Sequence, residues 1–191
     1  MGALDGRKVA FLAADGVEQS ELDAPWKAVE EAGGEPELIS LEEGTIQGHE
    51  HLEKGREYEV DRVAAEANAA DYAGLVLPGG VANPDFLRAD KNAVGFVLGF
   101  FEEGTPVAAI CHGAWTLVEA DVVRGRRLTS FASIKTDIKN AGGEWVDEAV
   151  VVDGGLVTSR GPDDLPAFCA KLVEEFAEGF HERQTDSVTE D

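Results

Sequence analysis

The sequence predicts an α/β fold, with a mostly parallel sheet and helices on its faces. Three observations support this prediction. Short apolar segments without alternation, such as residues 8–13 and 74–77, are typical of buried parallel strands. They alternate along the chain with segments in which apolar residues recur every three or four positions, as in amphipathic helices. The segment 107–115 joins a buried strand to a helix through Cys111-His112-Gly113, which is the layout of a nucleophile elbow.

The first 41 residues indicate a strand, a helix and a second strand. Residues 8–13 form the first strand and residues 37–41 the second. Apolar residues at spacings of three and four indicate the helix: Leu22, Trp26, Val29 and Ala32. Gly33-Gly34 ends it. We therefore predict a βαβ unit with a right-handed crossover.

The middle of the chain supplies two more strands. Residues 42–61 are polar, and we expect them to be irregular apart from a short strand near 58–60, with a helical turn or two following over 61–70. The third buried strand, 74–77, ends at Pro78-Gly79-Gly80. A helix is predicted over 92–103, before the fourth strand at 107–110.

The last third completes one domain spanning residues 1–180. We predict a short strand at 128–130, a helix over 134–141 and a hairpin over 150–157 that turns at Asp153-Gly-Gly155. The final helix begins near Asp164 and runs to about residue 180. The polar tail, 181–191, is expected to be disordered.

The charge is strongly negative. Asp and Glu total 38 against 16 Lys and Arg, a net charge of −22 over 191 residues. Nucleic acid is therefore not expected as a partner, because phosphate binding needs a basic face. Acids spread over the whole chain indicate a protein adapted to a salt-rich cytoplasm, where self-repulsion is screened. We expect stability and activity to rise with molar KCl.

No apolar run approaches the roughly 20 residues needed to span a bilayer, so no membrane association is expected. The N-terminal residues lack the apolar segment of a signal peptide, which predicts a cytoplasmic location. The two cysteines, Cys111 and Cys169, do not form the pattern of a disulfide framework.

Cys111 is the candidate nucleophile. At an elbow its thiol would lie at a helix N-terminus, where the dipole favours thiolate over thiol. The match is partial, since Ala109 stands where the usual elbow motif has glycine. The alternative is a buried, inert cysteine at the end of a strand.

Three segments are expected to meet beyond the carboxyl ends of the strands, where ligands bind in such sheets. They are the loop after the first strand with Glu18, the loop after the third strand with Gly79-Gly80, and the elbow with Cys111-His112. Their predicted convergence favours a functional elbow.

Four motifs occur in order along the chain: Asp15-Gly-Val-Glu18-x-x-Glu21-Leu22, Leu77-Pro-Gly-Gly80, Ala109-Ile-Cys-His-Gly113 and Ser159-Arg160-x-Pro162-x-Asp164-Leu165. Together they resemble the PfpI-type intracellular proteases, in the superfamily of the Parkinsonism-associated deglycase and the class I glutamine amidotransferases. The resemblance covers about residues 8–180 and implies a flavodoxin-like three-layer sandwich.

The resemblance implies a role for each site residue. Cys111 would be the nucleophile, Glu18 would hydrogen-bond to its thiolate, and His112 would belong to a triad completed by Asp85 of a neighbouring subunit. This implies a homo-oligomer, either a dimer or a hexamer. Each role has a structural alternative: Glu18 in a capping box with Asp15, His112 turned away from the thiol, and Asp85 as a helix N-cap after Pro84.

The resemblance also implies an oxyanion hole formed by the backbone N–H groups of Gly80 and His112. Gly79 and Trp115 are weaker candidates for the wall of the substrate pocket. No cofactor is expected. His49-x-His51-x-Glu53 has the residue types of a zinc site, but no fourth ligand is visible and we expect no metal.

Three functions fit these residues. The first is a glyoxalase III or deglycase that acts on reactive aldehydes and converts methylglyoxal to lactate through Cys111 and Glu18. The second is a cysteine peptidase or amidase that acts on peptides through Cys111, His112 and Asp85. The third is a non-enzymatic stress protein in which an exposed Cys111 of low pKa is oxidised reversibly.

Overall fold

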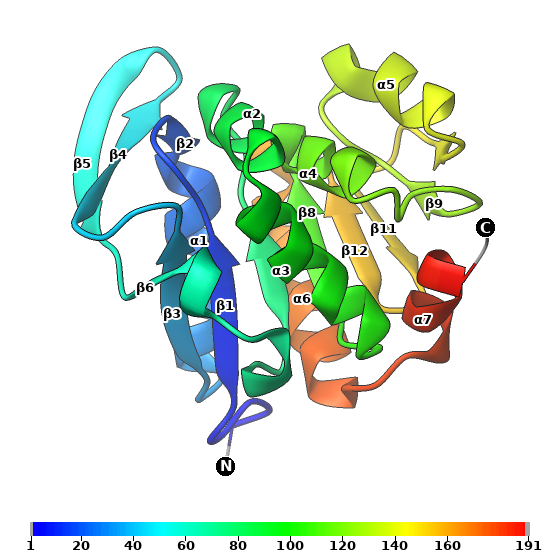
Figure 1. Cartoon of the computed structure of the whole chain (residues 1–191), viewed down its shortest axis with the longest axis horizontal. Helices are drawn as coiled ribbons and strands as arrows, with labels where there is room; N and C mark the ends of the chain where they lie inside the picture. Colours follow the sequence, from blue (N-terminus) through cyan, green and yellow to red (C-terminus); the bar gives the residue numbers. More distant parts are fainter. Residues whose placement is uncertain (1, 190–191) are drawn as a thin grey trace.

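A seven-stranded sheet forms the centre of the computed structural model, which describes residues 2–189 (Figure 1). Its strand order is β11-β12-β8-β7-β1-β3-β6, and only β11 runs antiparallel to its neighbour. The strands are β1 (Lys8–Leu12), β3 (Glu35–Ser40), β6 (Arg62–Val63), β7 (Leu75–Leu77), β8 (Val107–Ile110), β11 (Val150–Asp153) and β12 (Leu156–Ser159). The predicted α/β fold with a mostly parallel sheet is confirmed.

Helices cover both faces of the sheet. α1 (Gln19–Glu31) and α6 (Leu165–Glu178) pack on one face, and α3 (Lys91–Glu102) with α4 (Ala114–Glu119) packs on the other (Figure 1). The remaining helices are α2 (Ala82–Ala89), α5 (Lys135–Asn140) and α7 (Glu182–Thr189). Five 3₁₀ turns are η1 (Ala64–Glu66), η2 (Ala69–Asp71), η3 (Cys111–Gly113), η4 (Ala132–Ile134) and η5 (Pro162–Asp164). The layers form a three-layer sandwich.

The pleat of β1 explains why this strand is apolar throughout. Val9 and Phe11 belong to the core beneath α1 and α6, whereas Ala10 and Leu12 belong to the core beneath α3. Successive side chains of a strand point to opposite faces, so a strand covered on both sides needs apolar residues at every position.

We expected the polar segment 42–61 to be largely irregular, but the structure shows that it is regular. It forms an antiparallel hairpin of β4 (Thr45–Glu50) and β5 (Glu53–Glu59), which joins β2 (Val17–Glu18) in a second sheet. Only Ile46 and Gly48 are buried in β4, and β5 has no buried residue. The hairpin was missed because its strands lie largely outside the core and show little apolar alternation.

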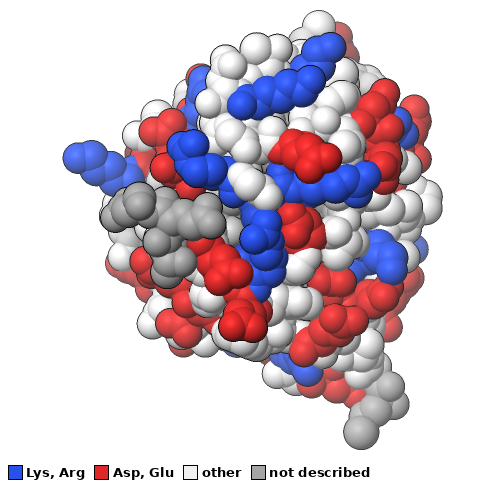
Figure 2. Space-filling view, turned by 90° about the vertical axis from the view of Figure 1, so that its right-hand side faces the viewer, with Lys and Arg blue, Asp and Glu red and all other residues white. Residues whose placement is uncertain are grey.

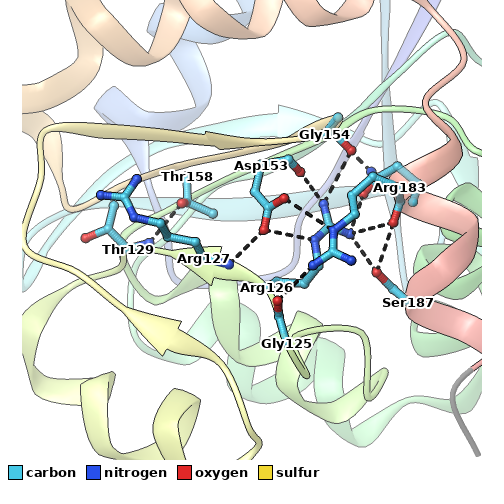
Figure 3. Close-up of polar contacts among 11 residues, drawn as sticks. Gly125, Arg126, Arg127, Thr129, Asp153, Gly154, Thr158, Arg183 and Ser187 are labelled. Carbon is cyan, nitrogen blue, oxygen red and sulfur yellow. Dashed lines mark hydrogen bonds and ion pairs between the residues drawn. The ribbon is translucent and has the colours of Figure 1, made fainter.

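The tail was predicted to be disordered, but residues 182–189 form α7. Residues 190–191 lie outside the described residues. The helix is held by polar contacts with the fully buried Arg126, whose Nη1 donates to Ser187 Oγ at 2.6 Å (Figure 3). The same nitrogen donates to Gln184 Oε1 at 3.0 Å. Gln184 itself is fully buried. A helix docked mainly through polar groups leaves little apolar pattern in the sequence.

Two short strands, β9 (Arg127–Leu128) and β10 (Glu144–Trp145), form a small parallel sheet beside the main one. Figure 2 shows the surface that lies on the right in Figure 1, where acidic and basic side chains lie close together. Among residues 2–189, no helix is both long enough and apolar enough to cross a bilayer.

Candidate active site

The expected turn from strand to helix lies at the end of β8. Cys111 has a φ of +61°, a left-handed conformation that costs a non-glycine residue on the order of 1–3 kcal/mol. Gly113 follows it, and a Cβ there would come within 2.4 Å of the Leu77 carbonyl oxygen. The strained turn projects the thiol from the sheet, and the glycine lets α4 begin against the neighbouring strand.

A pocket of about 230 Å³ opens at Cys111. It brings together four of the predicted site residues: Glu18, Gly80, Cys111 and His112. Its other lining residues are Glu21, His51, Leu52, Val81, Phe131 and Pro162. The predicted convergence of three loops is therefore present, and the β4–β5 hairpin and the segments that contain Phe131 and Pro162 complete the lining.

Asn83 holds two of these loops together. Its Oδ1 accepts a hydrogen bond from Ala14 N at 2.7 Å, and its Nδ2 donates to Pro78 O and Gly79 O, each at 3.0 Å. Asn83 is fully buried. The loop after β1 and the glycine loop after β7 are consequently fixed relative to each other.

Glu21 is the carboxyl group that contacts Cys111. It is fully buried, its Oε2 accepts a hydrogen bond from Gly79 N at 2.9 Å, and it lies beside the Cys111 thiol, while its Oε1 has no hydrogen-bond partner among the described residues. Burial, and then the negative charge of Glu18, raise the pKa of Glu21 to about 8. The carboxyl group is therefore largely protonated at neutral pH.

The structure corrects the expected role of Glu18. Its Oε2 accepts a hydrogen bond from His51 N at 3.0 Å and its Oε1 from Ser20 Oγ at 3.4 Å, so its carboxylate fixes the hairpin at the rim of the pocket. The capping-box alternative is also wrong, because Glu18 makes no side-chain cap on α1 and Asp15 accepts from Gln47 N instead.

Glu21 lies in a motif that the sequence analysis quoted, yet its role was missed. The signal was its position, because Glu21, Pro25 and Val29 are four residues apart and share the buried face of α1. An acidic residue in register with apolar core positions is rarely buried without a purpose.

The environment of Cys111 is more apolar than the elbow pattern suggested. The residue is only 7% exposed, and burial raises the pKa of its thiol, as does the charge of Glu21 when ionised. The backbone N–H groups of His112 and Gly80 oppose this by donating to the sulfur. Protonation of Glu21 removes this repulsion, so the titration of the Cys111 thiol and that of the Glu21 carboxyl group are coupled.

Gly80 has a backbone that only glycine adopts without strain. Its φ is +82°, and a Cβ would lie 2.2 Å from Gly16 O. Its N–H group is thereby free to face the sulfur beside that of His112. Gly79 packs directly against the thiol, since a Cβ at this residue would lie 2.6 Å from Cys111 Cβ.

His112 does not turn away from the thiol. Its Nδ1 lies 3.2 Å from Cys111 Sγ, and its Nε2 lies 3.0 Å from Ser133 Oγ. The ring stacks on Phe131 at 4.8 Å and meets Trp115 edge-on at 5.3 Å. Burial lowers the pKa of His112, which favours the neutral imidazole at neutral pH.

Trp115 was a candidate for the pocket wall, but it packs against the ring of His112 and is not among the residues that line the pocket. Asp85 lies within α2, where Val81 is the N-cap, so the N-cap alternative for Asp85 is wrong. Its side chain is 56% exposed and pairs with Arg88 at 2.8 Å. No contact joins Asp85 to His112 within the described chain, and a contact from a neighbouring subunit stays a prediction.

The three residues of the dismissed zinc pattern lie on the β4–β5 hairpin. Within residues 2–189 they do not bring three ligand atoms together, and the one group that does so lies elsewhere, at Glu175, Glu178 and His181.

A model of the DJ-1/PfpI family matches residues 7–175. The chain belongs to the DJ-1/PfpI family. It is 45% identical over 165 residues to protein/nucleic acid deglycase 2 of Escherichia coli, covering 85% of this chain and 93% of that protein. It is 41% identical over 162 residues to YraA of Bacillus subtilis, provisionally named a cysteine protease, covering 85% and 94% of the two chains.

The fold is likewise similar to a solved member of the family. Drosophila melanogaster DJ-1beta superposes with a TM-score of 0.81 at 26% identity, over 95% of each chain. The resemblance found in the four sequence motifs is thus confirmed at the level of family and fold.

Proposed function

We propose that this protein is a cysteine-dependent enzyme of stress protection that acts on small reactive aldehydes, with methylglyoxal converted to lactate. The observation that carries the proposal is the contact between the thiol of Cys111 and the buried carboxyl group of Glu21, whose pKa is raised to about 8. A nucleophile beside a carboxyl group that exchanges protons near neutral pH is sufficient for this chemistry.

The first step would begin when the Cys111 thiol loses its proton to solvent, and the thiolate then adds to the aldehyde carbon. The C–S bond forms as the carbonyl π pair moves to oxygen, and protonated Glu21 donates its proton to that oxygen. The product is a hemithioacetal with Glu21 ionised. The N–H groups of Gly80 and His112 are suited to stabilise the developing oxyanion, a contribution typically worth about 10²–10³ in rate per donor.

The second step would be a proton transfer between adjacent carbons. Ionised Glu21 removes the proton from the former aldehyde carbon to give an enediolate, a proton passes from the first oxygen to the second, and Glu21 returns its proton to the neighbouring carbon. This leaves a thioester of lactate on Cys111. Water then attacks the thioester carbonyl, the C–S bond breaks and lactate leaves. One proton of the water returns to Glu21 and the other is released to solvent, which restores the Cys111 thiolate and protonated Glu21. Every redox change occurs within the substrate, so no cofactor is needed.

A second candidate, a peptidase or amidase, is favoured by one observation. Acyl transfer requires an acid to protonate the leaving amine, and His112 Nδ1 lies 3.2 Å from Cys111 Sγ. Asp85 of a neighbouring subunit would complete this arrangement. Val81 and Phe86, on either side of Asp85, are 58% and 51% exposed, which suits the subunit contact of a dimer or hexamer.

The redox-sensing alternative is weaker, because it requires an exposed thiol of low pKa and Cys111 is 7% exposed. A cytoplasmic location belongs to the proposal and agrees with chemistry that needs a reduced thiol.

The test is methylglyoxal consumption with lactate formation by the wild type and Cys111→Ala, without added thiol, in about 2 M KCl so that surface charge is screened. Lactate from the wild type alone supports the proposal. A folded wild type that forms no lactate contradicts it. Cleavage of fluorogenic peptides that depends on both Cys111 and His112 would then favour the peptidase.

A further inference from the structure

Three potential metal ligands meet where α6 ends and the chain turns into α7. One ligand atom each from Glu175, Glu178 and His181 lies within 4.8 Å of the others. Glu175 and Glu178 are three residues apart on α6, so their side chains share one face. His181 follows the helix and folds back onto this face.

The backbone after α6 brings His181 into place. Gly179, with a φ of +88°, ends the helix and reverses the chain. The N–H group of His181 then donates to Gly104 O at 2.8 Å. Its side chain packs against Gly155, where a Cβ would come within 2.9 Å. The imidazole is therefore fixed by the fold.

The burial of this cluster leaves polar atoms without full partners. His181 Nε2 is buried and makes no hydrogen bond to any described residue, although it lies 3.4 Å from Glu175 Oε2. Glu175 is only 7% exposed, and besides His181 its carboxylate has the backbone N–H of Gly155 as a donor. An imidazole nitrogen and a carboxylate held together with too few donors form an environment that a cation would stabilise.

We propose that Glu175, Glu178 and His181 bind a divalent first-row transition cation of the zinc class. One imidazole nitrogen and two carboxylate oxygens are ligands that such ions accept, and water would complete the coordination. A tetrahedral site with bonds of about 2.1 Å places its donors roughly 3.4 Å apart. Closing from 4.8 Å requires only rotation of Glu178, which is exposed and gives the ion its entry path.

The site would fasten the C-terminal helix to the domain. The family match ends at residue 175, so Glu178, His181 and α7 lie beyond the matched region. Arg126 holds α7 through Gln184 and Ser187, and His181, directly before α7, is held by its bond to Gly104 O. A bound cation would cross-link α6 to His181 in the connection between α6 and α7. It would also raise the free energy of unfolding by mass action, because it binds only the folded state. This inference is independent of the proposed chemistry at Cys111.

The test is thermal unfolding of the EDTA-treated protein with and without ZnCl₂, in KCl and with Cys111→Ala in every sample to remove a competing thiolate. At free zinc about 100-fold above its dissociation constant, the midpoint should rise by roughly 5–10 °C for a chain of this size. Excess EDTA should reverse the shift. Zinc titration by calorimetry should give one site per chain.

Glu178→Gln is the decisive variant, because Glu178 is exposed and its loss leaves the fold intact. It should weaken zinc binding by about 100-fold or more, since even the outer partners of metal ligands are worth 10–100-fold. His181→Gln should do the same. Glu174→Gln is the matched control, because it removes an equal charge from the same helix at a residue paired with Lys171, and it should bind zinc like the parent. No zinc-dependent shift in the parent, or a shift that survives Glu178→Gln, overturns the proposal.

Discussion

Two ionisable side chains, Glu21 and Arg126, are both fully buried, yet their surroundings differ. The terminal nitrogens of Arg126 donate to Asp153 O and Ser187 Oγ (Figure 3) and to Gln184. Its Nε makes no hydrogen bond but forms an ion pair with Asp153 at 3.4 Å. Glu21 has only one backbone N–H donor and the thiol of Cys111.

Burying an ionisable group costs free energy in both places, but the two sites offset this cost in different ways. Satisfying a buried charge with hydrogen bonds fixes neighbouring segments, as Arg126 does for β11 and α7. Leaving a buried carboxyl without a cation shifts its pKa toward neutrality, which prepares it for proton transfer. The polar network at one end of the molecule is therefore structural, and the under-satisfied pair at the other end is chemical.

Glu21→Gln tests the chemical side and should have the largest effect. Glutamine occupies the same volume but cannot exchange a proton, so lactate formation should fall by about 10²–10⁴-fold. Glu18→Gln is the matched control, and we expect it to lower the rate by less than about 10-fold. The rates of both variants on methylglyoxal measure this. A larger loss from Glu18→Gln would restore the role that the sequence suggested for Glu18.

The dependence of stability on pH tests the raised pKa of Glu21 directly. The folded pKa is about 8 against about 4.3 in an unfolded chain. The folded state therefore holds the proton more tightly, and this contribution is complete below the unfolded pKa and is lost as the pH rises through the folded pKa.

Relative to Glu21→Gln, with Cys111→Ala in both proteins, the free energy of unfolding should fall by about 1.4 kcal/mol per pH unit between roughly pH 5 and pH 8. Denaturant unfolding at several pH values measures this difference. A difference independent of pH would mean that the carboxyl group is ionised throughout.

Arg126→Met tests the structural side. Its removal leaves Gln184, Ser187 and Asp153 without their shared partner, and we expect a loss of about 3–5 kcal/mol in the free energy of unfolding. Arg124→Met, two residues earlier and 58% exposed, should change stability by less than about 0.5 kcal/mol. Equal effects from the two variants would show that the network contributes nothing beyond a surface ion pair.

Ser133→Ala probes the orientation of His112. If Ser133 Oγ donates to Nε2, the proton of the neutral ring lies on Nδ1 and points at the thiolate. Loss of this contact should lower the rate by about 10-fold and shift the pH profile, and Ser133→Thr should restore both. A greater loss from Asp85→Asn than from Ser133→Ala would instead assign the orientation of His112 to the neighbouring subunit.

Salt should change the contribution of the surface charges to stability far more than the contribution of the buried Arg126 network. Unfolding of the wild type should require more denaturant in molar KCl than in dilute buffer, because screening relieves the repulsion among surface acids. The stability difference between the wild type and Arg126→Met should change by less than about 0.5 kcal/mol, since buried pairs are screened much less. Full stability of the wild type in dilute buffer would contradict adaptation to salt.

The sequence alone determined the sheet, the elbow and the family. Buried strands such as 107–110 must be apolar on both faces, and the turn at Cys111 needs a small residue such as Gly113 beside the neighbouring strand. Both constraints are local, so they appear in the order of residues along the chain. The same holds for the αL turn of the hairpin at Gly154-Gly155.

Only the tertiary structure decided which acid contacts the thiol and whether the tail folds. Glu18 and Glu21 are one helical turn apart and equally plausible in sequence, but α1 directs Glu21 inward while the β4–β5 hairpin engages Glu18. The tail folds because Arg126, more than 50 residues earlier, supplies its partners. Hydrogen bonds between distant segments leave no periodic signal in the sequence, because their energy depends on geometry that exists only after the chain has folded.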